Sequence, residues 1–337
     1  MTRRDLPTMF GARAPARLDL AGAWTDVPPF SAREGGVVVN AAIGLHAEAR
    51  LELGGTLIKL VAEDLGETLE CANSGGLVLD GRLNLHKAAL RMFPVLGNFT
   101  LTTRSAAPPG SGLGSSGALD VALVACLARA RHETLDAREL AQQAWHLEVV
   151  EAKLPGGRQD QCAAALGGIH RLSFRDPDVG VEPITLEPAF AEALASRMVL
   201  CYTGHSRVSA EMIARVAQSY ERGDGRVTGA LRALKDVAER MTEALRAADL
   251  ARVGALLTEN WTRQLELDPK MRTDEMGRLE RAMAAAGVLG GKAAGAGAGG
   301  SMFFLAGDRV HDARTAAQEF GATVLPVSWA HEGARAW

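Results

Sequence analysis

Residues 108–118 read PPGSGLGSSGA, a run of glycines and serines between two segments of different periodicity. The segment before it, 99–104, has the alternating apolar pattern of a strand, and the segment after it, ALDVALVACLARA, has the periodicity of a helix. Glycines let the backbone approach a ligand closely, and the first turn of a helix presents unpaired N–H groups with partial positive charge. The run therefore predicts an anion site suited to nucleotide phosphates. A tight turn capped by serines is the structural alternative for such a loop.

Two other nucleotide motifs have to be compared with this loop. A Walker loop requires GxxxxGK[ST], and no lysine follows these glycines. The Rossmann pattern GxGxxG is matched formally within 112–117, but it requires a following strand that ends in an acidic residue, and the region past Glu133 is predicted to be helical. A second formal match, within 295–300, is expected between a helix and a strand, which is the reversed order. The Walker motif is therefore absent, and neither GxGxxG match has the order of strands and helices that a Rossmann fold requires.

The composition is that of a soluble globular protein. The chain has 337 residues, of which 47% are hydrophobic and 23% charged, with a formal net charge of -3. This length allows two domains, and the charge gives no broad attraction to nucleic acid or to an anionic membrane. No apolar run approaches the roughly 18 residues that span a bilayer, and the N-terminus lacks the apolar core of a secretory signal. We expect neither nucleic acid nor a membrane as a partner.

The four cysteines are scattered along the chain, at Cys71, Cys126, Cys162 and Cys201. None of them forms a pair with metal-ligand spacing. This usage predicts reduced, mostly buried thiols in a cytoplasmic protein.

Strands and helices are unevenly distributed. Segments 36–51 and 56–61 have the pattern of strands, whereas helical stretches follow at 137–154 and, in three pieces, between 208 and 264. Because strands and helices do not alternate regularly, the order favours an α+β protein with two lobes. A segment rich in turn-forming and acidic residues, at 175–195, marks the boundary, and we divide the chain into 1–185 and 186–337.

The C-terminal part is expected to continue with further strands and helices around one glycine-rich connection. We expect strands at 196–203, 301–307 and 322–330, helices at 274–287 and 308–320, and the glycine-rich connection at 287–300.

Three motifs of this chain resemble those of one enzyme family. PPGSGLGSSGA closely resembles the second motif of the GHMP kinases, the family of galacto-, homoserine, mevalonate and phosphomevalonate kinases. APARLDLAGAWTD, at 14–26, aligns without gaps with the sugar-kinase pattern PGRxNLxGEHTD, and KAAGAGAGG, at 292–300, is similar to the family's KxxGAGGGG. Three motifs in the family's order are far more specific than any one of them alone.

The resemblance extends to one branch of the family. AGAWTDVPPF, GGRQDQCAAALGG at 156–168, YTGHSR at 202–207 and NWTRQLELDP at 260–269 look like the fucokinase and D-glycero-D-manno-heptose-phosphate kinase branch. The resemblance implies the GHMP kinase fold, with an N-terminal lobe like domain 2 of ribosomal protein S5 and a ferredoxin-like C-terminal lobe. It also implies transfer of the γ-phosphoryl of Mg-ATP to a sugar hydroxyl, typically the anomeric one, at a site between the lobes.

The catalytic residues follow from the same resemblance. Asp160 matches the aspartate that serves sugar kinases of this family as the base, and Arg17 is the cation expected to hold it and to reach the γ-phosphate. A carboxylate beside a cation stays ionised at neutral pH and can accept the proton of the attacking hydroxyl. Without the resemblance, Asp160 would be interpreted as a turn or helix-capping residue.

The cofactors implied are ATP and Mg²⁺. Glu148 matches the family glutamate that holds Mg²⁺ together with a serine of the loop, and we choose Ser116 over Ser115 for that role. Glu151, one helical turn on, is expected to be a solvated charge. The residues expected at the nucleotide are Pro109, Gly110, Gly112, Leu113, Gly114, Ser115, Ser116, Gly117, Gly295, Ala296 and Gly297.

The sugar is expected at the end of the first motif. Asp26 matches an aspartate that hydrogen-bonds sugar hydroxyls, and Trp24 is either a stacking platform for the sugar or a core residue. Ala23 and Trp24 stand where galactokinases have Glu-His, which argues against galactose. Further candidates are Gly157, close to the sugar, and Arg158 and Arg207 for a substrate phosphate, with surface ion pairs as the alternative for the arginines.

Three rival functions remain open at this stage. They are a GHMP kinase acting on a mevalonate-type alcohol, a pseudokinase that binds ATP and sugar without turnover, and an NAD-dependent oxidoreductase. The last is disfavoured by the missing Rossmann strand. The sequence also leaves open which sugar is used and whether the chain forms a homodimer.

Overall fold

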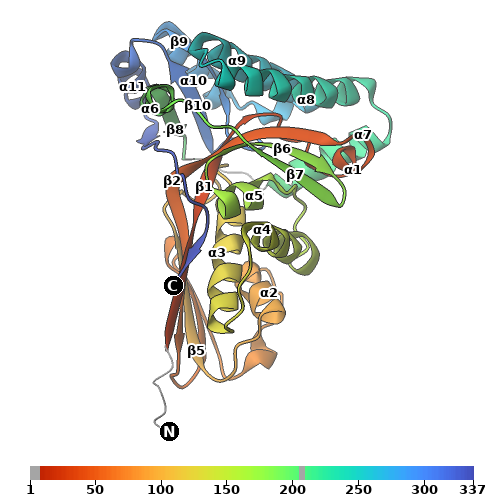
Figure 1. The fold of residues 1–337 in the computed structure, drawn as a ribbon, viewed down its shortest axis with the longest axis vertical. Coiled ribbons are helices and arrows are strands. Elements are labelled where there is room, and N and C mark those ends of the chain that lie inside the picture. The colour runs from red at the N-terminus through yellow and green to blue at the C-terminus, as the bar shows by residue number, and fades with distance from the viewer. Residues whose placement is uncertain (1–7, 205–208) are drawn as a thin grey trace.

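The structure is a computed structural model that describes residues 8–204 and 209–337. It has two lobes, each built on its own sheet, and they follow one another along the long axis of the molecule (Figure 1). The larger sheet has eight strands and the smaller one four in the described part of the chain. The predicted α+β, two-lobed class is therefore confirmed.

The larger sheet is organised around β2, a strand of 18 residues. One part of β2 pairs with β5 and another with β6, while β1 runs antiparallel beside both parts. The order is β12-β1-β2-β5-β3-β4, and β7 pairs with β6. The strands are β1 (Met9–Ala21), β2 (Gly36–Leu53), β3 (Ile58–Ala62), β4 (Glu67–Cys71), β5 (Phe99–Ser105), β6 (Ile169–Arg175), β7 (Asp178–Pro183) and β12 (Arg335–Ala336).

Helix α3 (Ser115–Ala130) packs on this sheet against β1 and β2. It is apolar on nearly every side, as a helix must be when other elements surround it. The surrounding helices are α2 (Asn84–Met92), α4 (Ala137–Trp145) and α5 (Gln159–Leu166), and a π-helical segment, His146–Glu151, extends α4. The short helix α1 (Phe30–Glu34) leads into β2. This packing holds the start of α3 beside the start of α5.

The smaller sheet is antiparallel throughout, in the order β11-β8-β10-β9. Its strands are β8 (Met198–Tyr202), β9 (Val288–Ala293), β10 (Ser301–Ala306) and β11 (Thr323–Leu325). Its helices are α6 (Pro188–Arg197), α7 (Ser209–Glu221), α8 (Gly225–Arg246), α9 (Leu250–Leu267), α10 (Asp274–Ala285) and α11 (Val310–Glu319). The amphipathic pair α8 and α9 packs together along the top of the molecule in Figure 1.

One hydrophobic cluster joins the two lobes. It contains Leu18 and Ile43 from the larger sheet, Leu200 and Phe303 from the smaller sheet, and Met241 from α8, all essentially buried. The end of the chain also returns to the larger sheet, where β12 pairs with β1. The predicted division at 185/186 falls between β7 and α6. The shared hydrophobic cluster and the β12–β1 pairing both join residues on its two sides, so the division into two domains stays a prediction.

Several predicted elements are confirmed, and others are wrong. Five predicted strands and the predicted helices are present with shifts in their ends. The strands are those predicted at 36–51, 56–61, 99–104, 196–203 and 301–307, and the helices are those predicted at 118–130, at 137–154, in three pieces between 208 and 264, at 274–287 and at 308–320. Only residues 323–325 of the strand predicted at 322–330 form one, since Pro326 follows them and has no N–H to donate. The segment at 175–195, which is rich in turn-forming and acidic residues, contains two elements that were not predicted, β7 and the start of α6.

The glycine-rich connection at 287–300 is the main correction. Residues 288–293 form β9, so the third motif lies in a β-hairpin rather than between a helix and a strand. A side chain at Gly290 would lie 1.8 Å from the carbonyl oxygen of Gly254 on α9. The glycine is therefore in the strand because α9 packs so closely on it.

Candidate active site

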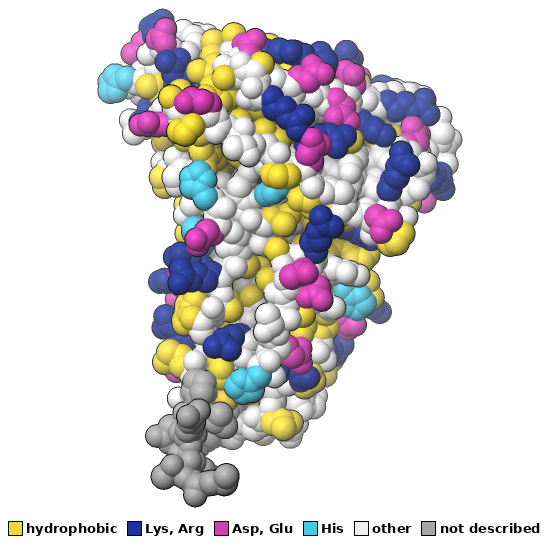
Figure 2. Space-filling model, viewed as in Figure 1, with side chains coloured by type: hydrophobic (Ala, Val, Ile, Leu, Met, Phe, Trp, Pro, Cys, Tyr) yellow, Lys and Arg dark blue, Asp and Glu magenta, His cyan; other side chains and the backbone are white. Residues whose placement is uncertain are grey.

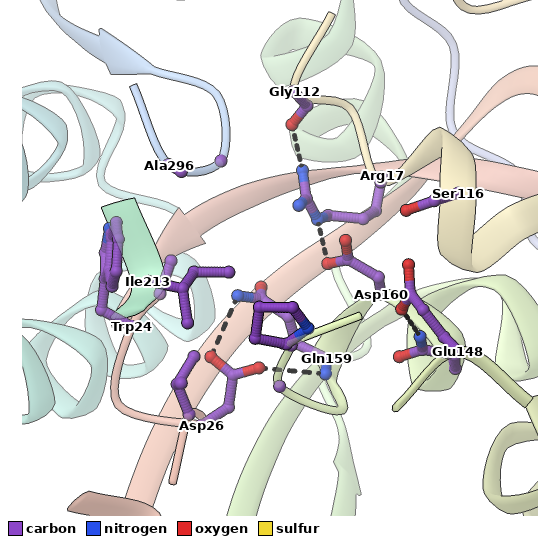
Figure 3. A pocket seen from close by; sticks show the side chains of 18 of the residues that line it. Arg17, Trp24, Asp26, Gly112, Ser116, Glu148, Gln159, Asp160, Ile213 and Ala296 are labelled. Atoms are coloured by element: carbon purple, nitrogen blue, oxygen red, sulfur yellow. Dashed lines mark hydrogen bonds and ion pairs between the residues drawn. The ribbon is translucent and has the colours of Figure 1, made fainter. Parts of the chain in front are cut away.

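A pocket of about 270 Å³ collects residues from all three motifs and from both lobes. Figure 3 shows Arg17, Asp160, Ser116 and Glu148 on one side of it, and Asp26, Trp24 and Ile213 on the other. The lining residues are Arg17, Ala23, Trp24, Asp26, Val27, Gly110, Gly112, Gly114, Ser115, Ser116, Glu148, Pro155, Gly156, Gly157, Gln159, Asp160, Gln161, Ile213, Gly295 and Ala296.

The start of α3 faces this pocket. Gly114 is the N-cap residue, in a left-handed conformation, and no side chain caps the helix. The N–H groups of the first turn are thus not used by a capping side chain, which is the geometry that favours an anion. The serine-capped turn, the alternative from the sequence, is not what forms here.

The predicted nucleotide residues fall into two groups. Gly110, Gly112, Gly114, Ser115, Ser116, Gly295 and Ala296 line the pocket, whereas Pro109, Leu113, Gly117 and Gly297 do not. Leu113 is fully buried, and its carbonyl accepts a hydrogen bond from the backbone N–H of Arg17. At Gly117, a side chain would lie 2.6 Å from Cβ of Asp160, so this glycine lets α3 and α5 approach each other.

The second and third motifs contact each other directly. A Cβ at Gly112 would lie 2.4 Å from the carbonyl oxygen of Ala294, and one at Gly295 would lie 2.8 Å from that of Gly112. Both glycines also have positive φ angles. The two loops therefore need glycine for their mutual packing as well as for any ligand.

Arg17 and Asp160 form the centre of the site. Arg17 Nε donates to Asp160 Oδ1 at 2.8 Å, and Arg17 Nη1 donates to the carbonyl oxygen of Gly112 at 2.6 Å. Burial disfavours the charge of Arg17, but the carboxylates of Asp160 and Asp19 outweigh this and raise the pKa of the guanidinium. Asp160 lies in the first turn of α5 and is partly exposed to the pocket. The predicted pair is thus brought together.

Glu148 lies in the π-helical segment, a distortion that is frequent at functional sites. Gln161 Nε2 donates to its Oε2 at 2.6 Å. Burial, followed by the charge of Asp160, raises the pKa of Glu148 to about 7, although hydrogen bonds from Ser116 and Gln161 oppose the shift. Glu151 does not line the pocket and pairs with His146 instead, as expected of a solvated charge.

Asp26 holds the start of α5. Its Oδ2 accepts the backbone N–H of Arg158 at 3.1 Å and that of Gln159 at 3.2 Å, and its Oδ1 accepts Nε2 of Gln159 at 3.2 Å. Burial and the neighbouring Asp160 raise the pKa of Asp26 to about 6. A carboxylate has about four acceptor positions, so at most about one remains for a ligand.

Trp24 and Arg158 differ in how they relate to the pocket. Trp24 is 5% exposed, yet it lines the pocket beside Ile213 of α7 (Figure 3), and its Nε1 has no partner among the described residues. The side chain of Arg158 instead binds Asp176 and the carbonyl of Pro177 and stacks on Trp145. This fits the ion-pair alternative for Arg158. Arg207, the other predicted phosphate ligand, lies outside the described residues.

Sequence reasoning missed four polar residues of this region. Gln159 donates to Asp26 and Gln161 donates to Glu148, and the two glutamines flank the predicted base in the sequence.

Asp120 of α3 is fully buried, with both carboxylate oxygens unpartnered among the described residues. Burial, followed by the charges of Glu148 and Asp160, raises its pKa well above the usual range. An aspartate at an apolar position of the pattern ALDVALV is the signal that could have found it. The fourth, Asp19, contacts Arg17 from within the first motif.

Comparison with known proteins gives the family. The family models for the GHMP kinases N terminal domain and the GHMP kinases C terminal domain match residues 83–168 and 241–323. The D-glycero-alpha-D-manno-heptose 7-phosphate kinase of Campylobacter jejuni is 30% identical over 336 residues, which cover 96% of this chain and 98% of that protein.

Two further relatives extend the comparison. The crystal structure of a D-glycero-D-manno-heptose 1-phosphate kinase from Bacteroides thetaiotaomicron superimposes with a TM-score of 0.80 at 26% identity, covering 97% of this chain and 98% of that chain. The bifunctional fucokinase/GDP-fucose pyrophosphorylase of Arabidopsis thaliana is 28% identical over 87% of this chain, but the match covers only 29% of that longer protein. With its motifs, its fold and these relatives taken together, the chain belongs to the GHMP kinases, a family of ATP-dependent phosphotransferases.

Proposed function

We propose that this chain is a sugar 1-kinase, which transfers the γ-phosphoryl group of Mg-ATP to the anomeric hydroxyl of a heptose 7-phosphate or a fucose-type sugar. The observation that carries the proposal is the Arg17–Asp160 pair, which lies in one pocket with the uncapped start of α3 on one side and Asp26 on the other. A base therefore has a nucleotide site and an acceptor site within the same cleft.

The residues present fit ATP and magnesium. The uncapped N-terminus of α3 offers N–H groups to phosphate oxygens. Glu148 and Ser116 supply the hard oxygen atoms that magnesium prefers. Burial, and then the charge of Asp160, raises the pKa of Glu148 to about 7, and a divalent cation bound there would favour its ionised form. When bound, the metal would screen the phosphate charge and leave the γ-phosphorus open to attack.

Asp160 is proposed to accept the proton of the attacking hydroxyl. Its carboxylate is oriented by Arg17, which is itself fixed by the carbonyl of Gly112 in the proposed phosphate loop, residues 108–118. The guanidinium fixes the direction of the Asp160 carboxylate, and its contact with the carbonyl of Gly112 places its positive charge beside the proposed phosphate site. Both contributions come from one buried side chain, so the base and the phosphate loop keep a fixed relation.

The sugar is proposed to lie between Asp26, Trp24 and Ile213. Asp26 has capacity for one hydroxyl beyond its three internal hydrogen bonds. The indole of Trp24 and the side chain of Ile213 provide an apolar wall for the face of a sugar ring. The proposal for a heptose 7-phosphate rests on the relative from C. jejuni, which matches over almost its full length.

We place the reaction in the cytoplasm. All four cysteines are unpaired, which is usual in a reducing compartment. No helix in the described ranges has the length and apolar character that a membrane crossing requires. Figure 2 shows basic and acidic side chains interspersed over the face in view, without a broad patch of one sign.

The test is a substrate screen with ADP release as readout. Heptose 7-phosphate, fucose, galactose and mevalonate are each supplied with Mg-ATP, and the phosphorylated position of any product is assigned by NMR. We expect turnover with a heptose 7-phosphate or fucose-type sugar and a product phosphorylated at the anomeric carbon. Turnover of mevalonate alone, or ATP binding with no acceptor-dependent ADP release, would contradict the proposal.

A further inference from the structure

Lys292, the first residue of the third motif, is fully buried between the lobes. Its Nζ donates to Asp19 Oδ2 at 2.6 Å, to the carbonyl oxygen of Asp19 at 2.9 Å and to that of Ala293 at 2.8 Å. The side chains of Lys292 and Asp19 both have 0% exposure. An ammonium group has three N–H donors, so these bonds use all of them. Lys292 therefore has no donor left for a phosphate, and its charged partner is Asp19.

Asp19 connects elements of both lobes. Its second oxygen, Oδ1, accepts the backbone N–H of Gly295 at 3.0 Å and lies 3.8 Å from Nη1 of Arg17. Gly295 belongs to the β9–β10 loop of the smaller sheet, whereas Arg17 projects from β1 of the larger sheet. Both line the pocket. One carboxylate thus contacts the third-motif loop and the arginine that holds Asp160.

The charge of residue 19 is required by this arrangement. The sugar-kinase pattern that aligns with the first motif has asparagine at this position, and this chain has aspartate. A neutral amide could accept the N–H of Gly295, but it could not neutralise a buried lysine. Burial lowers the pKa of Lys292, and the Asp19 carboxylate opposes that shift.

We propose that Asp19 is a positioning residue for phosphoryl transfer, which holds the Gly295 loop and Arg17 in a fixed relation across the two lobes, while Lys292 neutralises it. The inference rests on the proposed function of the pocket. A buried ion pair is a poor source of stability, because desolvation of the charges offsets their attraction. The pair can therefore be removed as a unit, and its role in positioning can be separated from its effect on folding.

The decisive variant is Asp19→Leu/Lys292→Met, which removes both charges and the acceptor for Gly295. We expect its melting temperature to stay close to that of the wild type, since no unpaired charge is left. Its kcat should fall by about 10²-fold, the usual consequence of misplaced catalytic groups, and its Kd for ATP should rise about tenfold, whereas the Kd for the sugar stays unchanged. Wild-type kcat and ATP affinity in this folded variant would overturn the proposal.

A conservative variant supplies the rescue. Asp19→Asn/Lys292→Met restores an acceptor for the N–H of Gly295 without restoring the charge. We expect it to regain most of the lost ATP affinity and part of the lost kcat. Equal defects in the two double variants would contradict the assigned contact. Because ATP binding is measured without an acceptor, this comparison stands whichever sugar the wild type phosphorylates.

A milder variant keeps the test informative if the double variants do not fold. Gln264 of α9 donates to the carbonyl of Gly295 at 2.9 Å and so holds the same loop from its other side. Gln264→Ala should weaken ATP binding, whereas Thr258→Val, which loses a similar bond from α9 to the N–H of Gly291 in β9, should not. Equal ATP affinities in these two variants would contradict a role of the Gly295 loop in ATP binding.

A control addresses buried lysines in general. Lys87 of α2 is also fully buried and pairs with Asp80 at 2.5 Å, away from the pocket. Lys87→Met should change the melting temperature without changing kcat or the Kd for ATP. A matching loss of kcat in this control would show that the effect of Asp19 is structural and would overturn the proposal.

Discussion

Asp26 lies directly against the backbone of Gly157. A Cβ at this glycine would lie 1.8 Å from Asp26 Oδ2, so Gly157→Ala must displace the carboxylate. We expect the KM for the sugar to rise at least about tenfold, the scale of one lost charged hydrogen bond, with little change in the KM for ATP. Gly156→Ala is the matched control, because its nearest contact would be an ordinary 3.7 Å. Equal sugar KM values in the two variants would contradict this account of Asp26.

The ionisation of Asp26 should also control sugar binding. Burial, and then the charge of Asp160, raises its pKa to about 6. The carboxyl group gains a proton as the pH falls below that value, and it then loses acceptor capacity for the sugar hydroxyl. We expect the Kd for the sugar to rise up to about tenfold per pH unit below pH 6 and to be flat above about pH 7. Calorimetric titration checks this, and Asp26→Asn should remove the dependence.

Some residues of the pocket region could be identified from the sequence, whereas others were missed or have partners that the sequence does not reveal. Arg17, Asp160 and Glu148 were identified because each matches a residue of the family that the chain resembles, and the structure brings them into one pocket. Asp120 was missed because nothing local marks a buried carboxyl group. Arg158 was named because arginine suits phosphate, but its actual partners, such as Asp176, depend on packing that residue type alone does not reveal.

At the scale of the elements, the contact between the second and third motifs should control ATP binding. Gly112→Ala would place a methyl group 2.4 Å from the carbonyl of Ala294 and force the two loops apart. We expect the KM for ATP to rise by about an order of magnitude or more, since misplaced groups typically cost up to about 10²-fold. The control is Gly97→Ala, at another positive-φ glycine with open space around it, which should only lower stability. Similar KM values for ATP in both variants would contradict the contact.

Local patterns predicted elements well where periodicity was strong. The helix that became α3 and the strand that became β5 follow directly from apolar spacing. β9 was missed because its glycines lower strand propensity. Packing that the sequence does not reveal makes them favourable there, since a side chain at Gly290 would meet α9 and one at Gly291 would meet Phe304 of β10. β1 was missed because Arg17 and Asp19 occupy buried positions of this strand, where charged residues are rare.

The molecule as a whole is held together by a core that both lobes share. Residues of both sheets and of α8 contribute to one buried cluster, and β12 returns from the second lobe to the first. We therefore expect one main calorimetric transition rather than two, although the chain has two sheets. Two well-separated transitions, with one retained after proteolysis near residue 185, would show independent domains.

At this scale the sequence was most informative. The order of the three motifs predicted the family, and the family predicted the two-lobed fold, both of which are confirmed. The crossing contacts could not be predicted, because they depend on how the last strand and the shared cluster meet in space.

The central claim is that Asp160, held by Arg17, is the base of phosphoryl transfer. It is tested most directly by the single-turnover rate of Asp160→Asn, with ATP affinity measured on the same preparation and Glu151→Gln as the control outside the pocket. We expect the rate to fall by about 10²–10⁴-fold, with ATP affinity retained and the control unchanged. A wild-type rate in Asp160→Asn would contradict the account.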